Sequence, residues 1–208
     1  MCVELAVTER LPTRLLVATT NPGKLAEIRA ILGALPLTLV TLADHPPLPE
    51  PEETGSTFAE NARLKARGYA GATGELTVAE DSGLEIDALD GEPGVRSARF
   101  NGESYADKFA TIERMLAERG TDSSTARFVC ALALARPTGI VWETTGVIEG
   151  RLQLPPRGDT GFGYDPVFYY PAFGRTLAEV TAEEKAAVSH RGQAFRRLRE
   201  YLGQRPAL

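Results

Sequence analysis

The chain has 208 residues, with 23 Lys and Arg against 28 Asp and Glu, and a formal net charge of −5 at pH 7. This acidic balance disfavours a nucleic-acid polymer as the main partner, because such binding depends on clustered Lys and Arg. The length suits a single α/β domain over residues 1–208, and no uncharged apolar run approaches the roughly 20 residues that span a bilayer.

The first half of the chain alternates predicted strands with predicted helices. Asn21 and Pro22 predict a helix start, because Asn caps free amides and Pro needs no hydrogen-bond partner at the first helical position. A later helix carries Phe58, Ala62 and Leu64, which we expect on its buried face. In chain order we expect a strand at 14–19, a helix from 22 to about 33, a strand at 38–42, a proline-rich loop at 44–51, a helix at 57–68 and a strand at 76–79.

The second half contains a predicted hairpin and a final helix. Glu80 and Asp81 end the strand at 76–79, and Thr181 and Glu184 have capping-box spacing. Ser189 suits the cap of the last helix. Early alternation of strands and helices followed by a hairpin indicates an α/β fold with a mixed sheet. We expect a strand at 84–88, a helix at 105–119, strands at 127–135 and 140–148 joined by a four-residue loop, and a glycine-rich loop at 157–164.

The two cysteines, Cys2 and Cys130, match no metal-ligand or redox spacing. Cys130 lies in the apolar run RFVCALALA, which predicts a buried thiol. The N-terminal residues lack a basic stretch followed by an apolar core, so we expect no secretory signal. These features favour the reducing cytoplasm.

The first candidate site is the strand-to-helix junction at 19–24. The free amides and the dipole of a helix start attract phosphate, and Lys24 adds a positive charge there. The Walker pattern is absent, since no glycine lies five residues before Gly23. The same residues are also typical of a well-capped helix without a ligand, so the segment leaves both interpretations open.

Two acidic segments form the second candidate, namely residues 50–53 and the pair Glu80-Asp81. A strand that ends in acids places carboxylates at the carboxyl edge of the sheet, where open α/β sheets bind ligands. Carboxylates usually meet a nucleoside polyphosphate through Mg²⁺. Charge runs are also typical of exposed loops, which is the alternative for residues 50–53.

The third candidate is the segment GFGYDP at 161–166. Its glycines let a ligand approach the backbone, Phe162 or Tyr164 suits stacking on a planar base, and Asp165 suits a ring N–H. An aromatic, glycine-rich loop is also typical of a structural turn. A fourth candidate is a group of donors suited to phosphate or carbonyl oxygens, Lys185, His190 and Arg191.

Five segments that follow one another in order resemble a known family. They are ATTNPGKLAEI, ETGSTFAENARLKA, AEDSGLEIDALDGEPGVRSARF, GFGYDPVF and TAEEKAAVSHRGQAF. Together they resemble the non-canonical purine nucleoside triphosphate pyrophosphatases, the inosine triphosphatase (XTP/dITP diphosphatase) family. The resemblance runs from about Leu15 to Leu202, which is nearly the whole chain.

This resemblance implies a fold, an activity and partners. The fold would be an elongated mixed sheet flanked by helices, with two lobes and a nucleotide cleft between them. The activity would be hydrolysis of ITP, dITP and XTP to the monophosphate and pyrophosphate with Mg²⁺, which keeps deaminated purines out of DNA and RNA. The chain would act as a cytoplasmic homodimer on a small-molecule substrate, without a membrane partner.

The resemblance also implies roles for individual residues. Asp81, alone or with Glu80, matches the general base, and Asp81 is also a metal ligand. Glu52 matches the second metal ligand best, with Glu53 one residue away. Thr20 stands where many members have Gly, which affects only the local backbone shape. The implied substrate-binding residues are Thr19, Thr20, Asn21, Pro22, Gly23, Lys24, Lys65, Ser82, Phe162, Gly163, Tyr164, Asp165, Lys185, His190 and Arg191.

Base selection can be argued from hydrogen bonding. Hypoxanthine and xanthine carry a 6-carbonyl where adenine carries an amino group, so donors from His190 or Arg191 would pair with that oxygen and reject adenine. Guanine shares this carbonyl, and no sequence pattern explains its rejection. Three alternatives stay open: a Maf-type pyrophosphatase for other bases, a receiver-like module phosphorylated on an acid, and a nucleotide sensor without turnover.

Overall fold

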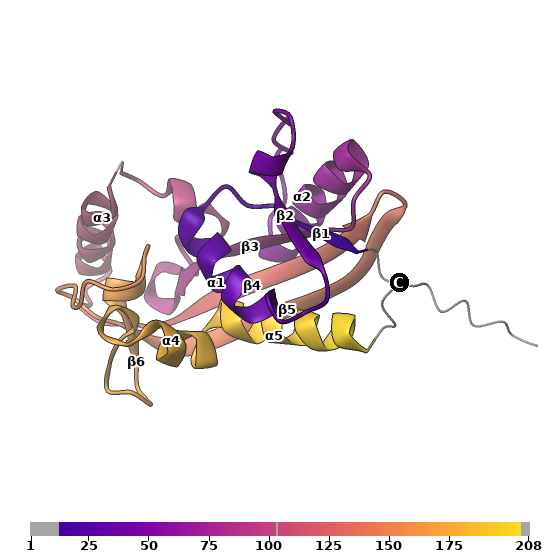
Figure 1. Cartoon of the computed structure of the whole chain (residues 1–208). Coiled ribbons are helices and arrows are strands. Elements are labelled where there is room, and N and C mark those ends of the chain that lie inside the picture. The colour runs from indigo at the N-terminus through magenta and orange to yellow at the C-terminus, as the bar shows by residue number, and fades with distance from the viewer. Residues whose placement is uncertain (1–12, 103, 205–208) are drawn as a thin grey trace, which may run out of the picture.

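A seven-stranded mixed sheet forms the centre of the computed structural model, which describes residues 13–102 and 104–204 (Figure 1). The strand order is β2-β1-β3-β4-β5-β6-β7. Strand β1 pairs with β2 and β3 in parallel, and all later neighbours pair antiparallel. The prediction of an α/β fold with a mixed sheet is therefore confirmed.

The bounds of the elements follow the predicted order of strands and helices. The strands are β1 (Arg14–Val17), β2 (Thr38–Thr41), β3 (Thr77–Ile86), β4 (Thr125–Arg136), β5 (Gly139–Leu152), β6 (Phe168–Tyr170) and β7 (Arg175–Thr176). The helices are α1 (Pro22–Leu32), α2 (Phe58–Thr73), α3 (Tyr105–Glu118), α4 (Ala182–Val188) and α5 (His190–Gly203), and a 3₁₀ segment, η3 (Gly94–Arg99), precedes α3.

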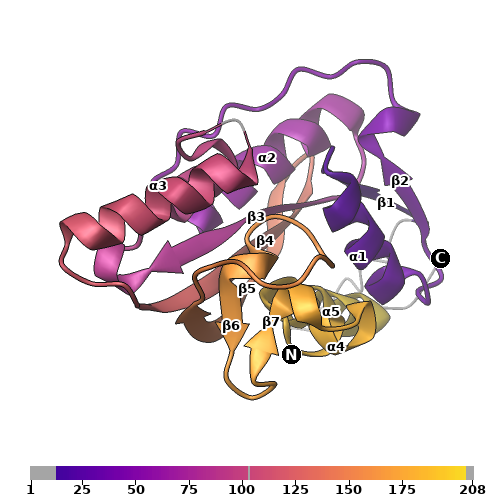
Figure 2. The same ribbon diagram turned by 90° about the vertical axis from the view of Figure 1, so that its left-hand side faces the viewer.

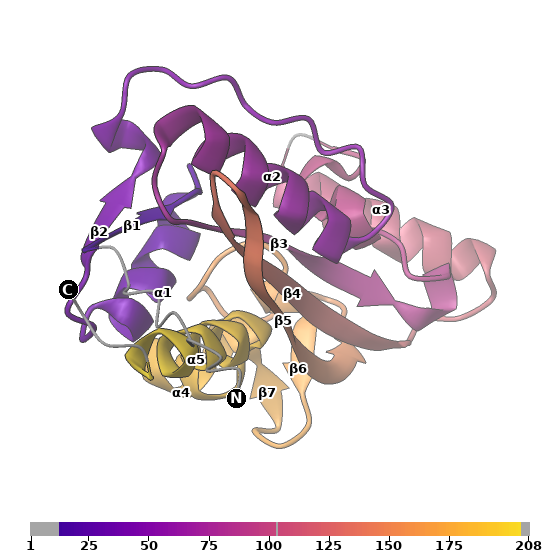
Figure 3. The same cartoon turned by 90° about the vertical axis from the view of Figure 1, so that its right-hand side faces the viewer.

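Helices cover both faces of the sheet, with α2 on one face and α5 on the other (Figure 3). Successive side chains of a strand point to opposite faces. Leu15 and Val17 of β1 therefore join a buried cluster with α1 and α5, whereas Leu16 joins one with α2. The apolar face predicted for the last helix is buried: Phe195, Leu198 and Leu202.

Helix α3 and strand β6 lie at the far end of the long strands (Figure 2), and both contribute to a further apolar cluster. Phe128 of β4 and Phe168 of β6 stack within it, with ring centroids 4.5 Å apart. Strand β3 contributes Val78 to the α1–α5 cluster and Leu84 to this one. Residues 80–83 therefore lie where the two lobes of the molecule meet, and this is where a cleft opens.

The helix starts are explained by local capping. Asn21 caps α1 and Pro22 lies in its first turn, as predicted. The capping box of Thr181 and Glu184 begins α4, and the Ser189 side chain caps α5 by accepting from a backbone amide. These positions are settled by contacts within one helical turn.

Helix α2 differs from its prediction in length and in its buried face. It continues past Gly68 to Thr73 and ends at Gly74, whose φ of +75° suits a residue without a side chain. Gly68 instead permits close packing of Pro51, because an added Cβ would lie 2.5 Å from a Pro51 ring carbon. The expectation that Leu64 faces the core is wrong, since this side chain is exposed.

Strand β3 is the largest departure from the predicted elements. The two strands expected at 76–79 and 84–88 are one continuous strand that passes through Glu80 and Asp81. Antiparallel pairing with β4 along its whole length satisfies the backbone. The hairpin of β4 and β5 is likewise longer than predicted, and two residues instead of four connect its strands.

Two expectations about the chain as a whole can be compared with the structure. Cys130 is fully buried, as predicted, and Cys2 lies outside the described residues. Among the helices of the described chain, none combines the length and apolar character needed to cross a bilayer.

Candidate active site

The start of α1 lies directly beyond the end of β1. The Asn21 side chain accepts a hydrogen bond from the Lys24 backbone amide at 3.0 Å, and the Thr19 hydroxyl accepts one from the Asn21 amide at 3.2 Å. These contacts hold the 19–24 loop at the N-terminal end of a helix dipole, where phosphate groups are stabilised.

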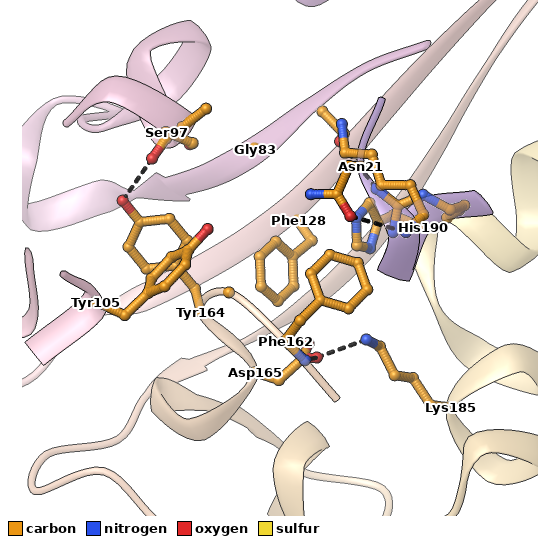
Figure 4. A pocket seen from close by; sticks show the side chains of 15 residues that line it. Asn21, Gly83, Ser97, Tyr105, Phe128, Phe162, Tyr164, Asp165, Lys185 and His190 are labelled. Carbon is orange, nitrogen blue, oxygen red and sulfur yellow. Dashed lines mark hydrogen bonds and ion pairs between the residues drawn. The ribbon is translucent and has the colours of Figure 1, made fainter. Parts of the chain in front are cut away.

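A cleft opens beside this loop (Figure 4). Its walls come from α1, the middle of β3, η3, α3, β4, the glycine-rich loop, α4 and α5, so segments far apart in the sequence meet there. The predicted substrate-binding residues that line it are Asn21, Lys24, Ser82, Phe162, Gly163, Tyr164, Asp165, Lys185, His190 and Arg191.

Other predicted site residues lie beside the cleft rather than in it. Thr19, Thr20 and Pro22 line an adjoining hollow that α2 also borders. Asp81 contacts Lys65 of α2 and so lies on the face of β3 away from the cleft. The pairing of β1 with β3 ends at Val17 and Val78, so β3 has no parallel neighbour at Asp81.

The Phe162 ring is packed between the start of α1 and two cations. The Lys185 ammonium lies 4.5 Å from the ring centroid, and the guanidinium carbon of Arg191 lies 5.6 Å from it. On the α1 side, a Cβ added to Gly23 would come within 2.8–3.2 Å of three ring atoms. Gly23 therefore leaves the space in which this aromatic platform sits.

Asp165 orders the glycine-rich loop behind Phe162. Its Oδ2 atom accepts hydrogen bonds from the Phe162 amide at 2.8 Å and from the Lys185 ammonium at 2.5 Å (Figure 4). No donor within the described chain reaches Oδ1, so this oxygen is the one available to a ring N–H. The neighbouring Tyr164 hydroxyl donates to the backbone carbonyl of Ser97 at 2.8 Å, which joins the loop to η3.

His190 is buried at the first position of α5 and stacks on Phe128, with ring centroids 4.7 Å apart. Burial, assisted by the charge of Arg191, lowers the pKa of His190 well below its ordinary value, so the ring is neutral. Within the described chain, its buried Nδ1 atom has no hydrogen-bond partner. A buried polar atom without a partner is costly, and a ligand in the cleft would satisfy it.

Arg191 binds two carboxylates from different elements. Its guanidinium donates to both carboxylate oxygens of Glu80 at 2.8 and 3.1 Å, to Glu27 of α1 at 2.8 Å and to the Ser82 hydroxyl at 3.0 Å. Glu27 also pairs with Lys185 at 2.9 Å. The network connects α1, β3, α4 and α5 behind the cleft.

These contacts bear on whether Glu80 could act as a base together with Asp81. Burial would raise the pKa of Glu80, but the charges of Arg191 and Lys24 outweigh it and hold the pKa well below its ordinary value. Cys130 adds a thiol hydrogen bond at 3.0 Å. A carboxylate with so low a pKa is a poor proton acceptor, which favours Asp81 over Glu80 in this role.

Asp81 lies in different surroundings on the opposite face of β3. It accepts hydrogen bonds from the side-chain amide of Asn61 and from the Lys65 ammonium, each at 3.1 Å. Burial raises the pKa of Asp81, although Lys65 and Asn61 oppose the shift. The Asn61 side chain also accepts a hydrogen bond from the Gly55 backbone amide at 2.8 Å. A single residue of α2 therefore links Asp81 to the loop that precedes this helix.

The acid that pairs with Lys65 beside Asp81 is Glu53, the neighbour of Glu52. Glu53 pairs with Lys65 at 2.7 Å and also with Arg99, whereas Glu52 is exposed. In the extended loop, successive side chains point in opposite directions, so a shift of one residue reverses which acid faces α2. Lys65 thus lies between two carboxylates.

Comparison with known proteins shows the family of this chain. The family model described as "Ham1 family" matches residues 15–201. The chain belongs to the Ham1 family. It is 49% identical over 191 residues to a dITP/XTP pyrophosphatase of Exiguobacterium sibiricum, covering 91% of this chain and 96% of that protein. It is also 49% identical over 194 residues to one of Geobacter sulfurreducens, covering 92% and 97%.

Solved Ham1 structures have the same fold. A HAM1 protein from Coxiella burnetii superposes with a TM-score of 0.86 at 39% identity, covering 93% of this chain and all of that one. Membership in the Ham1 family confirms the resemblance noted in the sequence. The antiparallel β4–β5 pair also departs from the regular strand–helix alternation that a receiver-like module requires.

Several residues of the candidate site were not predicted from the sequence. An acid on a helix is ordinary, so no local signal marks Glu27. Asn61 does carry a weak signal, because Asn is unfavourable inside a helix and often has a specific hydrogen-bonding role there. Ser97 and Tyr105 complete the cleft from η3 and α3, and only the packing of that lobe identifies them.

Proposed function

We propose that this chain hydrolyses ITP, dITP and XTP between the α- and β-phosphates, releasing the monophosphate and pyrophosphate. One observation carries the proposal: a cleft with a buried aromatic and histidine wall is lined by Ser82 of β3, whose neighbour Asp81 forms an acidic pair with Glu53 around Lys65. The names of the relatives, dITP/XTP pyrophosphatases, support the same substrates. Such hydrolysis would keep deaminated purines out of DNA and RNA.

In this proposal the cleft binds the nucleoside. The base stacks on Phe162, and His190 Nδ1, as the N–H tautomer, donates to the 6-carbonyl. Asp165 Oδ1 accepts from a ring N–H. Adenine would present an amino group to the His190 donor and leave both groups unpaired, which a buried site rejects strongly.

In this proposal hydrolysis takes place beside Asp81 and Glu53. Water attacks the α-phosphorus while the bond to the bridging oxygen of the β-phosphate breaks, and Asp81 accepts the proton of that water. Its raised pKa makes Asp81 a better base than an ordinary, exposed aspartate. Lys24 and Lys65 stabilise the negative charge as it moves onto the leaving pyrophosphate.

Glu53 and Asp81 fit a Mg²⁺ ion by the chemistry of their donors. Their carboxylates already share one cation, the Lys65 ammonium. Mg²⁺ binds through one or two carboxylates together with phosphate oxygens and water. In the described chain no third His, Cys, Asp or Glu joins them, which suits a site completed by the substrate. When bound, Mg²⁺ supplies charge neutralisation at the phosphate oxygens.

The proposal is tested by pyrophosphate release from ITP, XTP, GTP and ATP, each measured with Mg²⁺ and with a chelator. We expect rapid release from ITP and XTP with Mg²⁺, and little from ATP or without the metal. Equal rates for all four nucleotides, or no release from ITP and XTP, would contradict the proposal.

Glu52 and Glu53 give a matched pair of variants, because they are adjacent acids and Glu53 is the one that pairs with Lys65. Glu53→Gln removes one carboxylate from the pair that Lys65 joins, so the Mg²⁺ concentration for half-maximal activity should rise roughly tenfold or more. Glu52→Gln, one residue away and exposed, should leave it unchanged. A metal titration of both variants checks this. A larger effect at Glu52 would instead identify Glu52 as the metal ligand, as the family resemblance implies.

Gly23 offers a test of the aromatic platform. In Gly23→Ala, the new methyl group would press on the Phe162 ring and tilt it, so KM for ITP should rise roughly tenfold with a smaller change in kcat. Gly71→Ala is the control, because a Cβ there meets no atom within 4 Å. An unchanged KM in the Gly23 variant would show that the ring does not position the base.

The proposal also includes a cytoplasmic homodimer and one domain over residues 1–208. Light scattering at micromolar concentration should give twice the mass of 22.4 kDa. A monomeric mass together with full activity would contradict the dimer.

A further inference from the structure

Lys108 of α3 is a buried lysine without an acidic partner. Its side chain is 4% exposed, and its ammonium donates to the backbone carbonyl of Ala98 at 2.6 Å and lies 4.7 Å from the centroid of the Tyr105 ring. Lys65 and Lys185, by contrast, each contact two carboxylates. No ion pair of Lys108 exists within the described chain, and burial lowers its pKa.

This ammonium lies one layer behind the wall of the cleft. Both groups that it contacts, Ala98 and Tyr105, line the cleft. In Figure 4, Tyr105 and Asn21 lie on opposite sides of the Phe128 and Phe162 rings, so the wall is remote from the start of α1. A nucleotide with its phosphates at α1 therefore directs its base toward Lys108.

The charged groups near this wall in the described part of the chain have partners of their own. Asp165, whose charge reaches Tyr105, pairs with Lys185 at 2.5 Å. Asp107, the next acid on α3, accepts hydrogen bonds from the Ser104 amide and hydroxyl. Arg99 of η3 pairs with Glu53, which also contacts Lys65. An unpaired positive charge acts strongly across a poorly hydrated interior, where the effective dielectric constant is far below that of water.

Purine bases differ in how they respond to such a field. Xanthine carries an oxygen at position 2, and in its nucleotides it loses a ring proton around neutral pH, so the base is an anion in mildly alkaline solution. Hypoxanthine carries only hydrogen at position 2, and guanine carries an amino group whose hydrogens are positive. A nearby ammonium favours the first base and opposes the last.

We propose that Lys108 makes this cleft prefer xanthine over hypoxanthine nucleotides and disfavour guanine. The inference rests on the proposed function, because it concerns the base that the same cleft accepts. It assigns to a residue outside the cleft surface a role in specificity, exerted through charge rather than contact.

A purely structural role for Lys108 makes a different prediction. If the lysine only fastens η3 to α3 through Ala98, its loss would loosen the wall and reduce activity on every base alike. The electrostatic role changes the ratio between bases. The test therefore compares substrates within each variant.

Two variants separate charge from hydrogen bonding. Lys108→Gln keeps a donor for the Ala98 carbonyl but has no charge, and Lys108→Arg keeps the charge. In mildly alkaline buffer with Mg²⁺, we expect Lys108→Gln to lower the ratio of kcat/KM for XTP to that for ITP roughly tenfold. It should also raise activity on GTP relative to ITP, whereas Lys108→Arg should keep the wild-type ratios.

A second measurement needs no variant. Calorimetry on the wild-type protein should show that xanthosine monophosphate binds more tightly than inosine monophosphate in the same buffer. Unchanged ratios in Lys108→Gln, an equal loss for all substrates, or tighter binding of inosine monophosphate would overturn the inference. Wild-type protein that hydrolyses neither XTP nor ITP would instead refute the proposed function.

Discussion

Replacing Asp81 with Asn should lower kcat for ITP by about 10²–10⁴-fold, the range for loss of a general base. The introduced amide cannot accept the proton of the attacking water. It also presents an N–H₂ group to Asn61 or Lys65, both of which are donors to Asp81 in the wild type. The cleft residues that hold the base lie on the other face of β3, so nucleotide affinity should persist.

This prediction is checked by steady-state kinetics and by calorimetric binding of ITP to the same variant. Asp122→Asn is the control, because Asp122 is exposed and remote in sequence from the site. Hydrolysis at the parent rate by the Asp81 variant would remove Asp81 from the role of base. Loss of ITP binding together with activity would mean that Asp81 mainly holds the substrate.

Arg191→Met should reduce the free energy of unfolding by about 3–5 kcal/mol, as expected when one partner of a buried ion pair is removed. Arg191 is 3% exposed and Glu80 is 4% exposed. Methionine fills similar space but leaves Glu80 as a buried charge whose main partner has gone. Glu27 would lose the same cation, although Lys185 still contacts it.

The double variant Glu80→Gln, Arg191→Met removes both charges and should recover part of this loss. Urea denaturation measures both variants. Arg114→Met is the control: its ion pair with Glu118 is exposed, so its removal should cost less than about 1 kcal/mol. If the double variant is no more stable than Arg191→Met, the orphaned charge is not the cause.

The same pair determines a pH dependence of stability. Despite burial, the charges of Arg191 and Lys24 hold the pKa of Glu80 below its value in the unfolded chain. The contribution of Glu80 is therefore present above the unfolded pKa and lost as pH falls through the lower, folded pKa. Glu80 should thus keep stabilising the wild type in mildly acidic solution.

Local patterns were sufficient for the helix starts and for the order of elements. Asn21, Thr181 and Ser189 cap helices because their side chains reach amides within the next turn, a contact that the neighbouring sequence alone specifies. The resemblance to a known family extended the prediction to nearly the whole chain, because the five short segments occur in the same order as in that family.

Long-range packing decided what local patterns could not. The sequence was compatible with a strand that stops at two acids, yet β3 continues because β4 pairs with it throughout and because Arg191 and Lys65 neutralise Glu80 and Asp81. Those cations come from residues 111 and 16 positions away from their partners. Their proximity follows from the sheet, not from sequence spacing.

The sequence alone therefore predicted the family and the mixed fold correctly, since these depend on local periodicity, capping and motif order. Only the tertiary structure showed that Glu53 and Asp81 pair with Lys65 while Glu80 pairs with Arg191. Adjacent residues in extended chain point in opposite directions, so which of two neighbouring acids meets a cation depends on the element packed against each side.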